Sequence, residues 1–183
     1  MITYEELLSE YNLNKEKLDK GEEVDPLQLM FQGYALDAVD TAAENFKINL
    51  DFSEYSIEAV ERILDMLAKT MKRDKPSKDL VLKFAKTFSS YIGEVIRINW
   101  GGEWKAESEF SIKNGPALRV KGKDLFLLSK VYRRITTGVE DNVWNFYQII
   151  KDEIQGTKKF KEVEIEEVKV KEKKTWIDRI FHR

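Results

Sequence analysis

Apolar residues recur every three to four positions through the first hundred residues, which is the period of an amphipathic helix. Polar breaks and glycines separate these segments, and each segment opens near a residue that can cap a helix. Thr3 with Glu6 makes a capping box, and Asp25 precedes Pro26 at a first helical position. The pattern predicts four helices, at residues 3–20, 25–46, 53–71 and 77–100.

The period changes after Gly101 and Gly102, two residues that favour a turn. Residues 104–113 alternate between apolar and polar positions, as a half-buried strand does. A turn at 114–116 and a second strand at 117–121 complete a predicted β-hairpin. We then expect Asp124 to cap a fifth helix, and a capping box at 137–140 to open a sixth helix that ends at Gly156.

These elements predict an α+β fold, with about six helices and a small antiparallel sheet built on a central hairpin. Residues 1–156 are expected to form a single domain, in which Gly33 and Gly93 let other elements approach closely. Six aromatic side chains are expected in its core: Phe84, Phe88, Tyr91, Trp104, Phe110 and Phe146.

Residues 157–183 form a charged C-terminal extension with nine basic and six acidic residues. Thr175 can cap a short helix there, and four apolar residues then follow at helical spacing. These partner-binding candidates are Trp176, Ile177, Ile180 and Phe181. A helix this short is marginal in water, so we expect it to fold against its own domain, a second copy or a protein partner.

Composition narrows the chemistry by exclusion. Among 183 residues there is no cysteine and one histidine, His182, so disulfides, thiolate zinc sites and Ser-His-Asp triads are excluded within the chain. Phosphate-binding glycine loops do not occur, and we expect no cofactor and no metal. A net charge of −2 argues against nucleic-acid binding. No apolar run is long enough to span a membrane, and we expect a cytoplasmic protein.

The junction between the fourth helix and the first strand carries the densest local motif, Gly93-Glu94-Val95 followed by Gly101-Gly102-Glu103-Trp104. It resembles small bacterial domains of unknown function, in which a helix with a "GEV" element leads through a "GG-x-W" turn into a sheet. The resemblance covers roughly residues 50–154. It implies a small α+β fold in the bacterial cytoplasm, and it implies no catalytic residue.

Two functions remain. The main expectation is a non-enzymatic bacterial protein-binding domain of an inhibitor or immunity type, which acts through a protein partner or by self-association. The alternative is a carboxylate-dependent hydrolase with Glu94 and Glu103, or Asp65, in acid and base roles. The structural interpretation of Glu94 is an ion pair with Arg97 on the surface of the helix.

Overall fold

The computed structural model describes residues 3–106 and 115–156. In these ranges the chain forms six α-helices, a π-helical turn, a 3-10 turn and three short strands. The helices are α1 (Tyr4–Asp19), α2 (Pro26–Thr41), α3 (Ser56–Asp74), α4 (Lys78–Trp100), α6 (Leu127–Thr136) and α7 (Val143–Gln155). The turns are η1 (Ala42–Phe46) and η2 (Val139–Asp141), and the strands are β1 (Glu103–Lys105), β2 (Ala117–Val120) and β3 (Lys123–Leu125). The α+β architecture predicted from the sequence is confirmed.

Three predicted helix starts are confirmed by their caps. The Thr3 hydroxyl accepts a hydrogen bond from the Glu6 backbone N–H at 3.3 Å, and the Glu6 carboxylate accepts one from the Thr3 N–H at 2.7 Å. The side chains of Asp25 and Ser77 accept backbone N–H groups at the starts of α2 and α4. These caps act within four residues of sequence, so local pattern suffices to predict them.

Two other predicted starts are wrong. Asp124 does not cap a helix, because it lies in β3 opposite Arg119 and accepts two hydrogen bonds from that guanidinium, at 2.7 and 2.9 Å. The predicted capping box at 137–140 is replaced by η2, and the Asn142 side chain caps α7 by accepting the Asn145 N–H at 2.7 Å. At Asp124, the cross-strand Arg119 binds the side chain that was expected to cap a helix. At α7, Asn142 caps the start of the helix in place of the predicted box.

The sheet has the order β1-β2-β3 and is antiparallel throughout. The two predicted strands pair antiparallel, with Trp104 opposite Leu118, a register that a hairpin turned at 114–116 would not give. Residues 107–113 of the predicted first strand lie outside the described residues. The third strand was not predicted. Lys121 and Gly122 both have positive φ, at 46° and 80°, which is the backbone of a tight two-residue hairpin turn. The chain therefore doubles back there instead of entering a helix.

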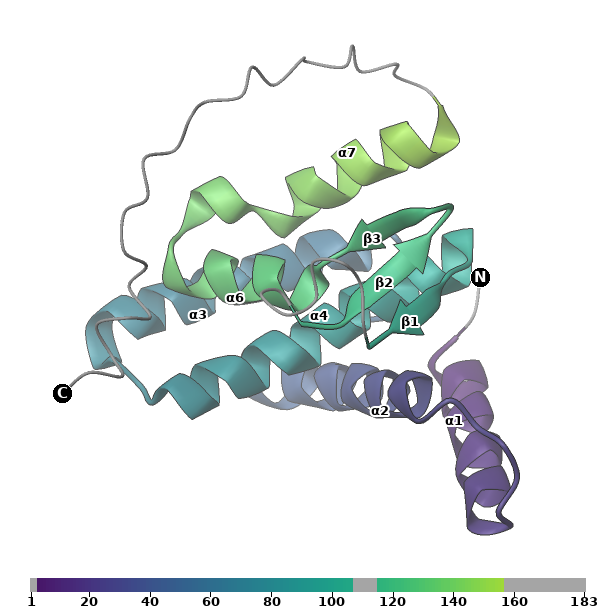
Figure 1. Cartoon of the computed structure of the whole chain (residues 1–183). Helices are drawn as coiled ribbons and strands as arrows, with labels where there is room; N and C mark the ends of the chain where they lie inside the picture. The colour runs from purple at the N-terminus through teal and green to yellow at the C-terminus, as the bar shows by residue number, and fades with distance from the viewer. Residues whose placement is uncertain (1–2, 107–114, 157–183) are drawn as a thin grey trace, which may run out of the picture.

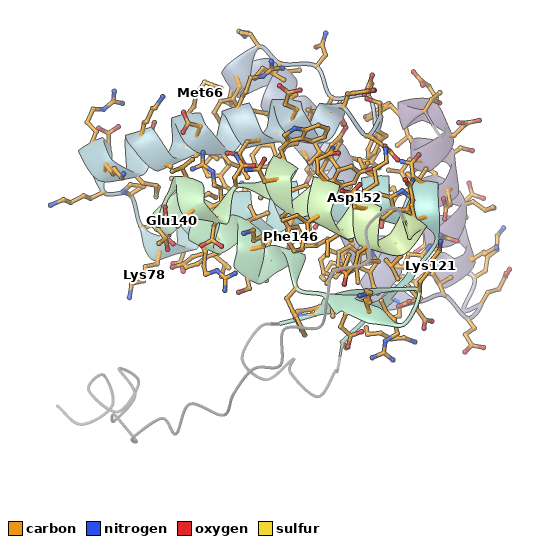
Figure 2. The ribbon with its side chains drawn as sticks, turned by 90° about the horizontal axis from the view of Figure 1, so that it is seen from above. Met66, Lys78, Lys121, Glu140, Phe146 and Asp152 are labelled. Atoms are coloured by element: carbon orange, nitrogen blue, oxygen red, sulfur yellow. The ribbon has the colours of Figure 1, made fainter. Side chains whose placement is uncertain are left out.

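The helix α4 packs between α2 and α6 (Figure 1). On the outer sides, α1 lies on α2, and α3 lies on both α6 and α7. Seen from above, Met66 on α3 lies on the opposite side of the body from α1 (Figure 2). Of the predicted core aromatics Phe88, Tyr91 and Trp104 are buried. Phe84 and Phe146 are only half-buried, and Phe110 lies outside the described residues.

Candidate functional site

A groove runs between α1 and the first half of α2, at the edge of the molecule where α1 stands away from the body (Figure 1). We call it the α1–α2 groove. Its lining comes from both helices and is mainly apolar: Tyr11, Leu18, Pro26, Leu29, Met30, Gly33, Tyr34 and Asp37. Leu18 is 49% exposed and Met30 is 43% exposed, although both sit on helices that carry core residues on another face.

Tyr11 is the side chain of α1 that packs on α2 at Gly33. A β-carbon at Gly33 would lie 3.4 Å from the Tyr11 ring, which is an ordinary van der Waals distance, so the contact does not depend on glycine at this position. With the ring held in place, Leu18 and Met30 are left beside it with apolar surface facing solvent.

The rim of the α1–α2 groove is acidic. Residues 3–47 contain eleven acidic and four basic residues. Asp37 lines the groove, and the exposed loop between the two helices carries Glu22 and Glu23. Burial, followed by the charges of Asp40 and other acidic neighbours, raises the pKa of the Tyr4 hydroxyl. The acidic neighbours, which include Asp37 of the groove wall, add to the effect of burial on this pKa.

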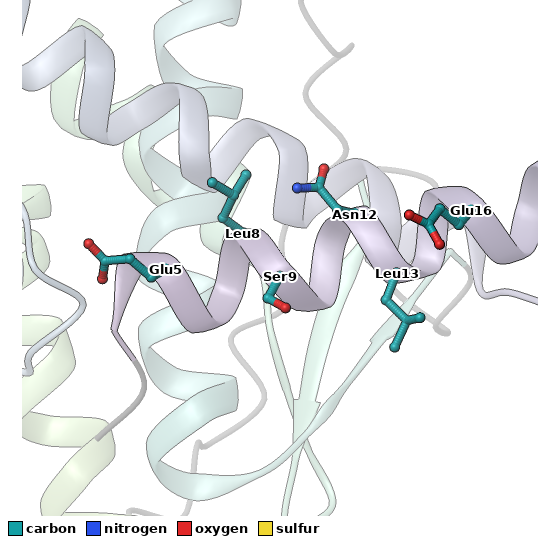
Figure 3. A pocket seen from close by; sticks show the side chains of 6 residues that line it. All are labelled: Glu5, Leu8, Ser9, Asn12, Leu13 and Glu16. Atoms are coloured by element: carbon teal, nitrogen blue, oxygen red, sulfur yellow. The ribbon is translucent and has the colours of Figure 1, made fainter.

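A second hollow follows the outer face of α1 alone (Figure 3). Leu8, Ser9, Asn12 and Leu13 line it, between Glu5 and Glu16. In Figure 3 the Leu13 side chain points away from the neighbouring helix, and it is 52% exposed. The exposed apolar surface of α1 therefore continues beyond the groove onto its outer face.

A narrow apolar face and a few long polar contacts attach α1 to the body, with Tyr4, Leu8 and Tyr11 packed partly buried against the core. Leu7 is the one buried residue among the sixteen of α1, all of which the structure describes. The Glu10 carboxylate accepts hydrogen bonds from the Gln28 amide at 3.3 Å and from the Arg97 guanidinium at 3.4 Å. Both distances are at the long end for hydrogen bonds. Because α1 contributes few buried side chains, a partner can bind its exposed surface without rearranging the core.

Glu94, the first candidate acid or base, was expected on the surface of its helix but is buried. It is fully buried on α4, where its carboxylate accepts the Trp104 indole N–H at 2.9 Å and the Arg97 guanidinium at 2.8 Å. The expected pair with Arg97 is present, but its location on the surface was wrong. Burial raises the pKa of Glu94 in spite of these donors.

Trp104 closes this site from the sheet side. Its indole stacks on Phe31 of α2, with ring centroids 3.7 Å apart, and lies against Gly93, where a β-carbon would come within 2.3 Å of the ring. The predicted close approach at Gly93 is confirmed. Because Trp104 is only 4% exposed, it covers Glu94 and separates that carboxylate from solvent.

Glu103 does not join Glu94. Glu103 and Lys105 flank Trp104 on β1 and form an exposed ion pair at 2.8 Å, on the face of the strand opposite to the buried indole. Asp65, the other candidate carboxylate, is bound by Lys69 at 2.7 Å and Arg134 at 3.0 Å, and its pKa is lowered by these hydrogen bonds. The candidate acid and base residues are thus placed apart, each with its own cation.

The four partner-binding candidates of the C-terminal extension, Trp176, Ile177, Ile180 and Phe181, lie outside the described residues. The groove itself was not predicted. Residues 27–34 of α2 contain apolar side chains at 27, 29, 30, 31 and 34, which is a wider stripe than one packed neighbour covers. That width is the signal from which the groove could have been found.

Comparison of the chain with protein-family models, with curated proteins and with solved structures finds no match in any of the three. The resemblance of the helix–strand junction to small bacterial domains therefore stays a prediction. Within residues 3–106 and 115–156, no helix is long and apolar enough to cross a membrane. Nor do three acidic or histidine side chains of that part of the chain gather where they could hold a metal ion.

Proposed function

We propose that this chain is a non-enzymatic protein-binding domain of the bacterial cytoplasm, of an inhibitor or immunity type, which holds its partner in the α1–α2 groove. The observation that carries the proposal is the exposed apolar lining of that groove, represented by Leu18 and Met30, inside an acidic rim. Apolar patches rimmed by polar residues are typical of protein interaction sites.

The chemistry of the groove favours one kind of partner, a short basic amphipathic helix. Two helices with apolar walls form a groove of the sort that receives the apolar face of a third helix. The excess of acidic residues between positions 3 and 47 would attract lysine and arginine on the polar face of that helix and would discriminate against acidic ligands.

The positions of the candidate carboxylates support a binding protein over a hydrolase. A general acid or base has to reach the substrate, and Glu94 is covered by Trp104 and bound to Arg97. Glu103 lies on the opposite face of β1 and pairs with Lys105. Neither carboxylate lines the α1–α2 groove or the hollow on α1.

The test is affinity capture from a lysate of the organism that makes the chain, with three versions of the full-length protein. The first is the wild type, and the second carries Leu18→Gln and Met30→Gln in the groove. The third, the matched control, carries Leu82→Gln and Met66→Gln, on α4 and α3, where both side chains are similarly exposed. We expect the wild type and the control to retain one protein that the groove variant loses.

The captured protein must then show the proposed chemistry. A synthetic peptide that covers its most basic amphipathic segment should bind the wild-type chain in isothermal titration calorimetry, and its Kd should rise as salt is added. Equal capture by the groove variant and the wild type would contradict the proposal. So would a partner whose basic segments do not bind.

A further inference from the structure

We propose that residues 175–183 of this same chain dock in the α1–α2 groove, so that the groove is covered until a partner displaces them. The inference rests on the proposed function, because it names the regulator of the same site. Three observations carry it: the apolar pattern of that segment, the opposite charge of the two regions, and the length of the chain that joins them.

The apolar pattern makes the segment a suitable ligand for the groove. Trp176, Ile177, Ile180 and Phe181 share one face at helical spacing, and two of them are aromatic. A helix of this length needs a surface to form on. The groove offers apolar surface for such a face, with the side chains of Leu18 and Met30 about half exposed.

The charges favour the same pairing. The extension 157–183 has nine basic and six acidic residues, whereas residues 3–47 have eleven acidic and four basic residues. Their net charges are thus opposite in sign, and a basic segment brought to the groove finds Asp37 on its wall and Glu22 and Glu23 in the adjoining loop.

The other exposed apolar hollows fit the segment less well. The hollow near Leu82 is lined by both Lys78 and Asp79, so its charge offers no attraction to a basic segment. The hollow near Met66 has Arg62 on its rim, and its acidic residue Asp65 is already paired with two cations. The hollow on α1 carries Glu5 and Glu16, but it is formed by one helix and lacks the second wall that the α1–α2 groove provides.

The length of the connecting chain does not restrict which surface the segment can contact. Eighteen residues, 157–174, separate Gly156, the cap of α7, from Thr175. An extended chain of that length spans at most about 60 Å, and a domain of this size has a radius of gyration of about 15 Å. The segment can therefore arrive at any face of the body, and the chemistry of the surface decides where it stays.

Cysteine trapping in the full-length chain tests the inference, because the chain has no cysteine of its own. The test pair is Asp37→Cys on the groove wall with His182→Cys, next to Phe181. The matched control pair is Arg62→Cys, exposed on the rim of the Met66 hollow, with the same His182→Cys. Neither pair removes an apolar side chain from the groove or from the segment. Because Asp37→Cys removes the carboxylate on the groove wall, the electrostatic attraction that remains in the test pair comes from Glu22 and Glu23 in the adjoining loop.

Under mild oxidation at low protein concentration, we expect the test pair to form an intramolecular disulfide at least about ten times faster than the control pair. The excess should disappear at high salt and when Trp176→Ser and Phe181→Ser are added to the test pair. Equal rates for the two pairs would overturn the inference. Disulfide-linked dimers in place of the intramolecular bond would also overturn it, because the occupant would then come from a second copy.

The two proposals fail in different ways. If the trapping rates are equal but capture still depends on Leu18 and Met30, the groove binds a partner without the segment as regulator. If trapping succeeds but capture does not depend on those residues, the groove is only the seat of the chain's own segment, and the proposed function is wrong.

Discussion

The helices α1 and α4 begin in the same way and end in different roles. Each is opened by a hydroxyl cap, Thr3 in one and Ser77 in the other, and each has apolar residues at helical spacing. Yet α4 buries twelve of its twenty-three residues and α1 buries Leu7 alone. Caps and spacing thus determine that a helix forms, while the number of neighbouring elements determines how much of it becomes core.

This difference separates the stability of the two regions. Local unfolding takes place where few apolar side chains are buried, and by this measure α1 is the first element to open while α4 is among the last. The α1–α2 groove lies on the side of the molecule where α1 buries few side chains. A partner bound there would contact α1 and would leave the core around α4 unchanged.

The largest loss of stability is expected from a substitution in the core around α4. Trp104→Ala removes the ring that fills the space over Gly93 and stacks on Phe31, and we expect the free energy of unfolding to fall by about 3–5 kcal/mol. Urea denaturation followed by circular dichroism measures it. The half-buried Trp144, replaced by alanine in the same way, serves as the control and should cost less. A loss below about 1 kcal/mol for Trp104 would place it outside the core.

A smaller and more local effect is expected in α1. Leu7→Ala should cost about 2 kcal/mol, at the low end for a buried leucine, because the hole lies between two helices that can close over it. Hydrogen exchange should show faster exchange of the α1 amides with those of α4 unchanged. The control on the same helix is Leu13→Ala, whose side chain is exposed. Equal loss of protection in both helices would show that α1 opens only with the whole body.

The smallest expected effect depends on pH and concerns Glu94. Its carboxylate binds Arg97, whose guanidinium also reaches Glu10 on α1. Burial raises the pKa of Glu94, so protonation of this carboxyl favours the folded state. Its stabilising contribution is present below the pKa it has in the unfolded chain, and is lost as the pH rises through its folded pKa. The free energy of unfolding of the wild type minus that of Glu94→Gln should therefore decrease from pH 4 to pH 7.

Urea denaturation of both proteins at several pH values checks this direction. Glu103→Gln is the matched control, because Glu103 is exposed and its pair with Lys105 lies on the surface. A difference between wild type and Glu94→Gln that stays constant, or that grows with pH, would show that Arg97 and Trp104 outweigh the burial of the carboxylate.

The sequence predicted the features that depend on near neighbours. The caps at Thr3, Asp25 and Ser77 and the end of α4 near Trp100 follow from contacts within one helical turn. The prediction failed at Asp124, where a cross-strand arginine five positions away draws the side chain into the sheet. A capping signal read from the sequence cannot include a competitor that only the folded topology brings opposite.

In the candidate site, too, local contacts could be predicted from the sequence and long-range contacts could not. The pairing of Glu94 with Arg97 was expected, since the two are three residues apart on one helix. The burial of Glu94 was not, because it depends on Trp104 and Phe31, which come from two other elements. The wide apolar stripe of residues 27–34 signals surplus apolar surface on α2, but which of its side chains stays exposed depends on how few elements pack on that side of the helix.

The stack of Phe31 on Trp104 also has a consequence for the order of folding. The two rings belong to residues 31 and 104, so their contact closes a long stretch of chain that contains α3 and α4. Contacts between distant residues slow folding, because the intervening chain must first be brought together. During synthesis, α2 leaves the ribosome long before Trp104 does. The nascent chain therefore carries Phe31 without its stacking partner until β1 emerges.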